Sequence, residues 1–419
     1  MSEGSVMGKK FKDLYKLMCQ DEWNPYVTGI IVAFFSVLIL AWMRPWGAVG
    51  AIRNWGDWII YGLGMNPFEM FEDGAPRHFL KGSGSIIGVG FIAGAFLSAN
   101  LGNQFALRIP PLRELAKAVI AGVLMGVGAA FAGGCNVGGF YNAIGNLSAH
   151  GFAMMLGLVL GAVLGLKALY WEMENVTWGS GGAKTIEFPF ALQVILGLLA
   201  LSGILCGAYN YAGSENDYLG KMGGILLISA ALGYAMQRGR WCMIQGFREP
   251  HMTGDCTLAK SVALSILLLA IGIAVIKAAG LQDTVHYVRG TFGWGAVVGG
   301  LLFGLGAMFA GGCGTGTLWR VGEGQLKLWL VVPFFGISNS LMTAWFKADE
   351  ELGGLGDFEG KEDWLEEGIT TTSRLGEYVY MPDTFLGYGG TLILIALAMG
   401  AWYLVVKWNE DSNKLIVPM

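Results

Sequence analysis

Charged side chains are scarce in this 419-residue sequence. Asp, Glu, Lys and Arg together make up 14% of it, whereas soluble domains carry roughly 25%. Hydrophobic residues make up 54%, and the mean hydropathy is +0.53. So few charged side chains cannot cover the water-exposed surface of a soluble protein of this length. The composition therefore indicates a protein that lies in a lipid bilayer.

Other shortages argue against several functional classes. The sequence has only four histidines, with no pair at the spacing of haem or metal ligands, so we predict no metal site and no cofactor. We also expect no enzyme activity. Its six cysteines are too far apart to suggest the disulfide framework of a secreted protein. The net charge is −4 without a long basic run, which argues against a nucleic-acid partner. The polar first 25 residues show no signal peptide.

Long apolar segments dominate the rest of the chain. A membrane-spanning helix needs about 20 predominantly apolar residues, and ten segments meet that requirement. The sequence therefore predicts an all-α polytopic membrane protein. The expected spans are 26–43, 84–101, 114–133, 151–170, 190–212, 222–240, 258–280, 293–311, 326–347 and 385–407.

Two segments differ from the spans. Residues 45–64 are rich in Trp and carry Arg53 and Asp57, which predicts an interfacial helix at the headgroup level. Residues 348–383 contain eleven Asp and Glu against two basic residues, which predicts an acidic extramembrane loop. The sequence predicts five parts. Residues 1–83 hold an N-terminal segment, the first span and the interfacial helix, residues 84–212 a first repeat half, and residues 213–347 a second repeat half. Residues 348–383 form the acidic loop, and residues 384–419 hold the last span and the tail.

Basic residues indicate the orientation. They cluster before the first span, after the second and after the sixth, so all three clusters fall on one side if every segment spans. Because basic residues mark the cytoplasmic side, we expect both termini in the cytoplasm and the loop 348–383 outside a cell inner membrane.

An internal repeat relates two parts of the chain. Residues 122–138 read GVLMGVGAAFAGGCNVG and residues 300–316 read GLLFGLGAMFAGGCGTG, with eleven of 17 positions identical. With the predicted spans the two copies run in opposite directions, which is the inverted repeat of many transporters.

Each copy ends in a cluster of glycines around a cysteine. Several glycines this close should end a helix, and unwound backbone within a membrane is tolerated only where protein buries it or where it lines a cavity. The freed N–H groups and the start of a new helix can face an anion. Helix packing explains Gly122, Gly126 and Gly128. It does not explain a cysteine at both breaks, so we predict an anion path that includes Gly134, Cys135, Asn136, Gly312, Cys313, Gly314 and Thr315.

A third cysteine, Cys242, follows Arg238 and Arg240 at the end of a span. Nearby arginines can attract an anion and favour the thiolate, so Arg240 and Cys242 join the candidate path, although ordinary boundary arginines remain an alternative. Arg320 and Glu323, three residues apart, are candidates for an ion pair.

The remaining cysteines are weaker candidates. Cys206 reads as a small core residue, Cys256 as a helix-start residue that could line an entrance, and Cys19 has no evident role.

The segments AGGCNVGG, AGGCGTGTLWRVGEG and MQRGRWCMIQGFRE resemble the YeeE/YedE-type sulfur transporters, whose characterised members take up thiosulfate. The resemblance covers about residues 84–347. It implies that Cys135, Cys242 and Cys313 line a narrow path towards which short helices point their N-terminal ends. It also implies a separate cytoplasmic sulfur-carrier (TusA-like) protein as partner.

Thiosulfate suits such a path chemically. It has one soft sulfur and hard oxygens, and a polarizable thiol can hold that sulfur loosely, as conduction requires. The expected function is uptake of a small sulfur anion. A soft-metal or selenium-species transporter, a membrane subunit of a sulfur-handling redox complex and a scaffold without transport remain alternatives from the residues alone.

Overall fold

The computed structural model describes residues 3–71, 74–179, 181–281, 288, 290–349 and 375–418, with only the backbone given for residues 3–6. Ten helices in this part of the chain are long and apolar enough to cross a membrane, which confirms the predicted fold class. They lie within a few residues of the predicted spans. They are α2 (Pro25–Trp42), α4 (Ser83–Leu101), α5 (Leu112–Phe131), α7 (His150–Asn175), α8 (Phe190–Ala212), α9 (Asp217–Arg238), α11 (Thr257–Ala278), α12 (Trp294–Ala310), α14 (Leu326–Ala348) and α16 (Gly387–Ser412).

Shorter elements join the spans. They are α1 (Glu3–Tyr15), η1 (Lys16–Gln20), α3 (Val49–Gly62), η2 (Pro67–Glu69), β1 (Ala106–Ile109), η3 (Asn136–Tyr141), α6 (Asn142–Gly145), β2 (Lys184–Glu187), α10 (Met243–Met252), α13 (Gly314–Gly322) and η5 (Met381–Asp383). Strands β1 and β2 form an antiparallel pair in which Ala106 faces Glu187 and Ile109 faces Lys184.

The outer helices expose apolar side chains. On α8 the residues Ile195, Leu198, Leu199 and Leu205 are each more than half exposed, and only 17% of that span is buried. Apolar surface on this scale marks contact with a membrane or a partner. For a helix of spanning length, lipid supplies that contact.

Helices from the two predicted halves pack against one another. The largest contacts join α7 with α12, α4 with α9, and α5 with both α14 and α12. Helices α5 and α12 run antiparallel: Gly128 packs on the backbone of Phe303, and Gly306 packs on Ala121 nearer the start of α5. Gly122 and Gly126 pack on α14, so close packing does explain these glycines, as predicted. The two helices that carry the similar segments therefore run in opposite directions.

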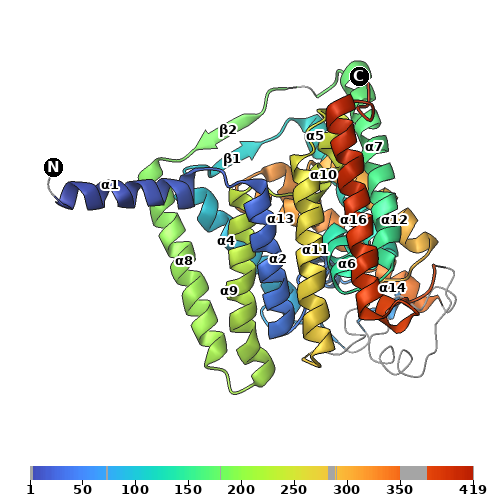
Figure 1. The fold of residues 1–419 in the computed structure, drawn as a ribbon. Coiled ribbons are helices and arrows are strands. Elements are labelled where there is room, and N and C mark those ends of the chain that lie inside the picture. The colour runs from blue at the N-terminus through green and yellow to red at the C-terminus, as the bar shows by residue number, and fades with distance from the viewer. Residues whose placement is uncertain are drawn as a thin grey trace.

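Both termini lie at the same end of the bundle, together with β1 and β2 (Figure 1). Helices α5 and α14 also begin there, since Arg108 of β1 forms a bridge with Gln325, next to the start of α14. Of the predicted acidic loop 348–383, residues 350–374 lie outside the described residues.

The predicted interfacial segment 45–64 is only partly a helix. Helix α3 begins at Val49 and packs between α4 and α14. The preceding residues enter the protein interior: the Trp46 indole donates to Ser36 Oγ (2.7 Å) and stacks on Phe91. Pro45 cannot donate to a helix hydrogen bond, and the buried Trp46 fixes this non-helical turn.

Candidate functional site

The two glycine-cysteine segments have almost the same backbone conformation. Helix α5 ends at Phe131 and Gly133 has φ +65°; helix α12 ends at Ala310 and Gly311 has φ +81°. Glycine adopts this left-handed conformation at little cost and therefore terminates helices. The following cysteines are extended, with φ −74° and ψ −179° at Cys135 and φ −75° and ψ −176° at Cys313.

Each of the three candidate cysteines precedes a short helix. Cys135 precedes η3, Cys242 precedes α10 and Cys313 precedes α13. The Cys313 sulfur accepts from the Gly316 backbone N–H at 3.3 Å and so caps α13. Each of the three sulfur atoms therefore lies at the start of a helix, where the first backbone N–H groups have no partner within the helix.

The three thiols converge although they come from distant parts of the chain. Cys242 Sγ and Cys313 Sγ are 3.5 Å apart, and Thr315 Oγ1 lies 3.4 Å from Cys313 Sγ. A methyl group added at Gly314 would lie 3.2 Å from Cys135 Sγ, so the third thiol packs against the same segment. All three cysteines are fully buried, and all are free thiols.

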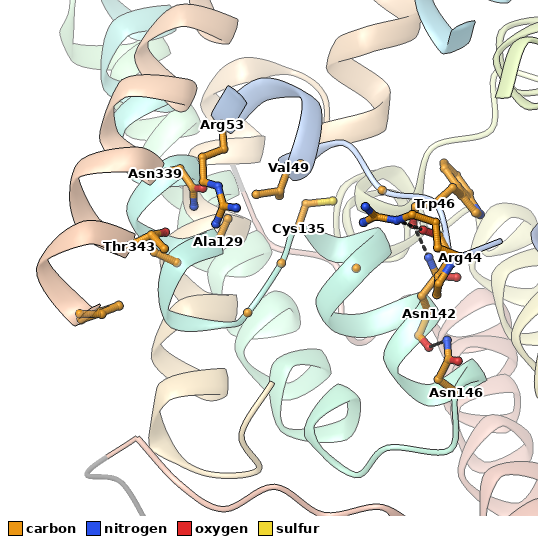
Figure 2. Close-up of a pocket in the computed structure, with 18 residues that line it drawn as sticks. Arg44, Trp46, Val49, Arg53, Ala129, Cys135, Asn142, Asn146, Asn339 and Thr343 are labelled. Atoms are coloured by element: carbon orange, nitrogen blue, oxygen red, sulfur yellow. Dashed lines mark hydrogen bonds between the residues drawn. The ribbon is translucent and has the colours of Figure 1, made fainter. Parts of the chain in front are cut away.

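A cavity of about 140 Å³ reaches Cys135. Figure 2 shows Arg44 and Arg53 on either side of this cysteine, with Asn142 and Asn146 below it. Asn142 is held by a hydrogen bond from its Nδ2 to the Trp46 carbonyl. The cavity thus offers two guanidinium groups and two amides beside one thiol, which is a lining suited to an anion.

Beyond the other two thiols the lining is ionic. The Arg320 Nη1 atom lies 3.9 Å from Cys242 Sγ and also donates to the Gly316 carbonyl. The almost fully buried Glu323 carboxylate accepts from Arg240 at 2.7 Å and from Arg108 at 3.0 Å. Arg240 has φ +48°, a conformation that non-glycine residues seldom adopt and that gathers at functional sites.

The site departs from two sequence-based predictions. Glu323 does not pair with Arg320, because Arg240 and Arg108 reach it from other elements while Arg320 faces Cys242. The guanidinium group beside the Cys242 sulfur is likewise that of Arg320, whereas Arg240 binds Glu323 and lies over the Trp319 ring.

The other cysteines lie elsewhere. Cys206 is exposed on α8, so its predicted place in the core is wrong: α8 is an outer helix that turns most of its side chains outward. Cys256 is buried against Val406 in a separate small cluster. Cys19 is partly exposed and accepts from Tyr234.

Arg44 and Arg53 are lining residues that the sequence did not single out. Arg53 appeared only as a charge in the interfacial segment. An available signal was the Arg44-Pro45 pair directly after an apolar span, which ends a helix and leaves a cation near the membrane.

The chain is similar in sequence to known and probable sulfur transporters. A family model described as "Sulphur transport" matches residues 5–164 and 238–417. The probable transporter YedE of Escherichia coli strain K12 is 26% identical over 387 residues, which covers 89% of each chain. The thiosulfate transporters TsuA of E. coli strain K12 and of Spirochaeta thermophila are 36% and 33% identical over shorter regions, covering 28% and 27% of this chain and 33% of each relative. The chain belongs to the sulphur transport family.

Proposed function

We propose that this protein carries thiosulfate across the membrane along a path lined by Cys135, Cys313 and Cys242. The observation that carries the proposal is the convergence of three buried free thiols at three helix starts, with one of them beside a cavity lined by two arginines. Two relatives of this chain are named thiosulfate transporters.

The proposed path begins in the cavity. The Arg44 and Arg53 side chains attract a dianion from water, and amide groups of Asn142 and Asn146 replace part of its hydration shell. Cys135 then meets the soft terminal sulfur. No covalent step is required. A thiol can donate a weak hydrogen bond to the terminal sulfur, and its own polarizable sulfur packs against it.

Buried polar groups beside the thiols lack partners, which supports a ligand there. Both amide atoms of Asn136, the hydroxyl of Thr317 and the indole N–H of Trp319 have no hydrogen-bond partner within the described residues. Leaving a polar group buried and unpaired costs about 1–3 kcal/mol, so each such group calls for an explanation. An anion in transit supplies an acceptor for the three donors among them, Asn136 Nδ2, the Thr317 hydroxyl and Trp319 Nε1.

The far end of the path carries a net positive charge that one carboxylate reduces. Glu323 accepts from both Arg240 and Arg108, so it balances one of these two cations, and Arg320 adds a further cation beside Cys242. The carboxylate weakens the hold of these arginines on an anion that leaves the thiols. This favours release, which conduction needs as much as binding.

We expect Arg53→Gln to raise the thiosulfate concentration for half-maximal uptake roughly fivefold, since loss of one charge contact in a hydrated cavity is worth about 1 kcal/mol. The maximal rate should change little, and added salt should shrink the difference. Lys81→Gln is the matched control, because Lys81 is exposed at the start of α4 and does not line the cavity. An unchanged half-maximal concentration in Arg53→Gln, or an equal rise in the control, would contradict this role.

We propose that the protein lies in a cell inner membrane with both termini in the cytoplasm. The basic clusters gather at the end of the bundle that holds the termini, and basic residues mark the cytoplasmic side. A separate TusA-like sulfur carrier is proposed to receive the cargo at that end. Protease added outside spheroplasts should cleave within 348–383 and spare the termini, and the carrier should co-purify with the chain. Cleavage at the termini alone would reverse the orientation.

Competition in intact cells tests the choice of substrate. Cells that express the chain should accumulate label from radiolabelled thiosulfate, and excess unlabelled thiosulfate should suppress it. Sulfate has the oxygens but no soft terminal sulfur, so it should suppress little. Equal suppression by sulfate would show that the thiols do not select the cargo.

A further inference from the structure

The N-terminal helix α1, with the η1 turn that continues it, is amphipathic and largely uncovered. Met7, Phe11, Leu14 and Met18 recur at helical spacing and are 74%, 71%, 56% and 45% exposed. Four lysines, at positions 9, 10, 12 and 16, share the same 13-residue helix and turn. At 100° per residue, Lys9, Lys12 and Lys16 lie opposite the apolar stripe.

Helix α1 differs in direction from the spans (Figure 1). It lies across the direction of the spans at the end that holds both termini, and it extends away from the bundle past α8 (Figure 1). Three hydrogen bonds anchor its inner end: Tyr15 Oη donates to the Leu101 carbonyl, Tyr234 Oη to that of Met18, and Trp23 Nε1 to that of Leu17. The bundle therefore holds the axis of α1 across the direction of the spans.

From this geometry we propose that α1 is a membrane-surface helix that binds the anionic leaflet. Its apolar stripe enters the boundary between headgroups and acyl chains, while Lys9, Lys12 and Lys16 stay on the aqueous side of the helix, within the negative surface potential of the anionic headgroups. Charge complementarity favours lipid as the occupant, because each lysine near an anionic surface contributes to binding, and an apolar face with lysines on the opposite face is the usual pattern of interfacial helices. The proposal does not depend on which substrate is transported.

Hydrogen exchange on the full chain in nanodiscs tests the proposal. The discs hold a single copy each and contain either phosphatidylcholine alone or phosphatidylcholine with phosphatidylglycerol. Amides of α1 should exchange roughly tenfold more slowly in the anionic discs, because the lysines add to the affinity for the leaflet. The triple variant Lys9→Glu, Lys12→Glu, Lys16→Glu should lose this difference while the spans keep their protection.

A matched triple variant provides the control. Lys184→Glu, Lys407→Glu and Lys414→Glu change the net charge equally at exposed positions outside α1, and this variant should keep the lipid dependence. Phe11→Ser with Leu14→Ser should speed the exchange of α1 in both lipids. Equal exchange of wild-type α1 in the two lipids would overturn the proposal. Protection that appears only in discs with two copies would also overturn it, since the occupant would then be a second copy of the chain.

Discussion

Replacement of Cys135, Cys242 or Cys313 by alanine is expected to abolish thiosulfate uptake in each single variant. In the proposed path these three buried thiols are the donors that meet the anion where water is excluded. A lost hydrogen bond to a charged group costs about 1.5–3 kcal/mol, which corresponds to a roughly ten- to hundredfold loss. Serine keeps a donor but lacks the polarizable sulfur, so it should restore little.

Two native cysteines serve as controls for this series. Cys206 is exposed on α8, and Cys256 is buried away from the path, so their alanine variants should transport normally. Thermal stability must be measured in every variant, because a folding defect would also reduce uptake. Normal uptake by folded Cys135→Ala or Cys313→Ala protein would show that the cysteines only shape the breaks.

Addition of a single methyl group at Gly316 is expected to block the path. A Cβ atom at this position would lie 2.8 Å from Cys242 Sγ and 3.3 Å from Cys313 Sγ, inside the normal contact distance of both thiols. Alanine favours helix formation over glycine by about 1 kcal/mol, so the backbone of α13 should tolerate it. We expect Gly316→Ala to lower uptake at least about tenfold while the protein stays folded, since the methyl group displaces the two sulfurs.

Gly203→Ala is the matched control, because a Cβ at Gly203 on α8 would meet no atom within 4 Å. Uptake and thermal stability should be compared in the same preparations. If Gly316→Ala protein transports as fast as Gly203→Ala protein, the cargo does not pass between Cys242 and Cys313.

The spans could be predicted from sequence because lipid imposes a simple requirement. A segment either has about 20 apolar residues or does not, and all ten predicted segments meet this test as helices in the structure. The repeated FAGGC segment likewise predicted Cys135 and Cys313 as candidate site residues. Their nearly equal backbone angles show why the same pentamer recurs: both positions need a glycine that ends one helix and an extended residue that starts the next.

Contacts between distant segments could not be predicted in the same way. Spacing alone paired Arg320 with Glu323, but Glu323 binds Arg108 and Arg240, which are 215 and 83 residues away in the chain. Arg44 lies beside Cys135 only because the turn at Pro45 folds back into the bundle. Apolar composition also could not tell a buried cysteine from one on an outer helix, which is why Cys206 was misplaced.

Uptake by the purified chain alone is the most direct test of the central claim. Proteoliposomes that contain only this protein are given radiolabelled thiosulfate outside, and the label trapped inside is measured against empty liposomes. The proposed path predicts saturable accumulation that vanishes in Cys313→Ala protein and persists in Cys206→Ala protein. Accumulation no greater than in empty liposomes would contradict the proposed transport.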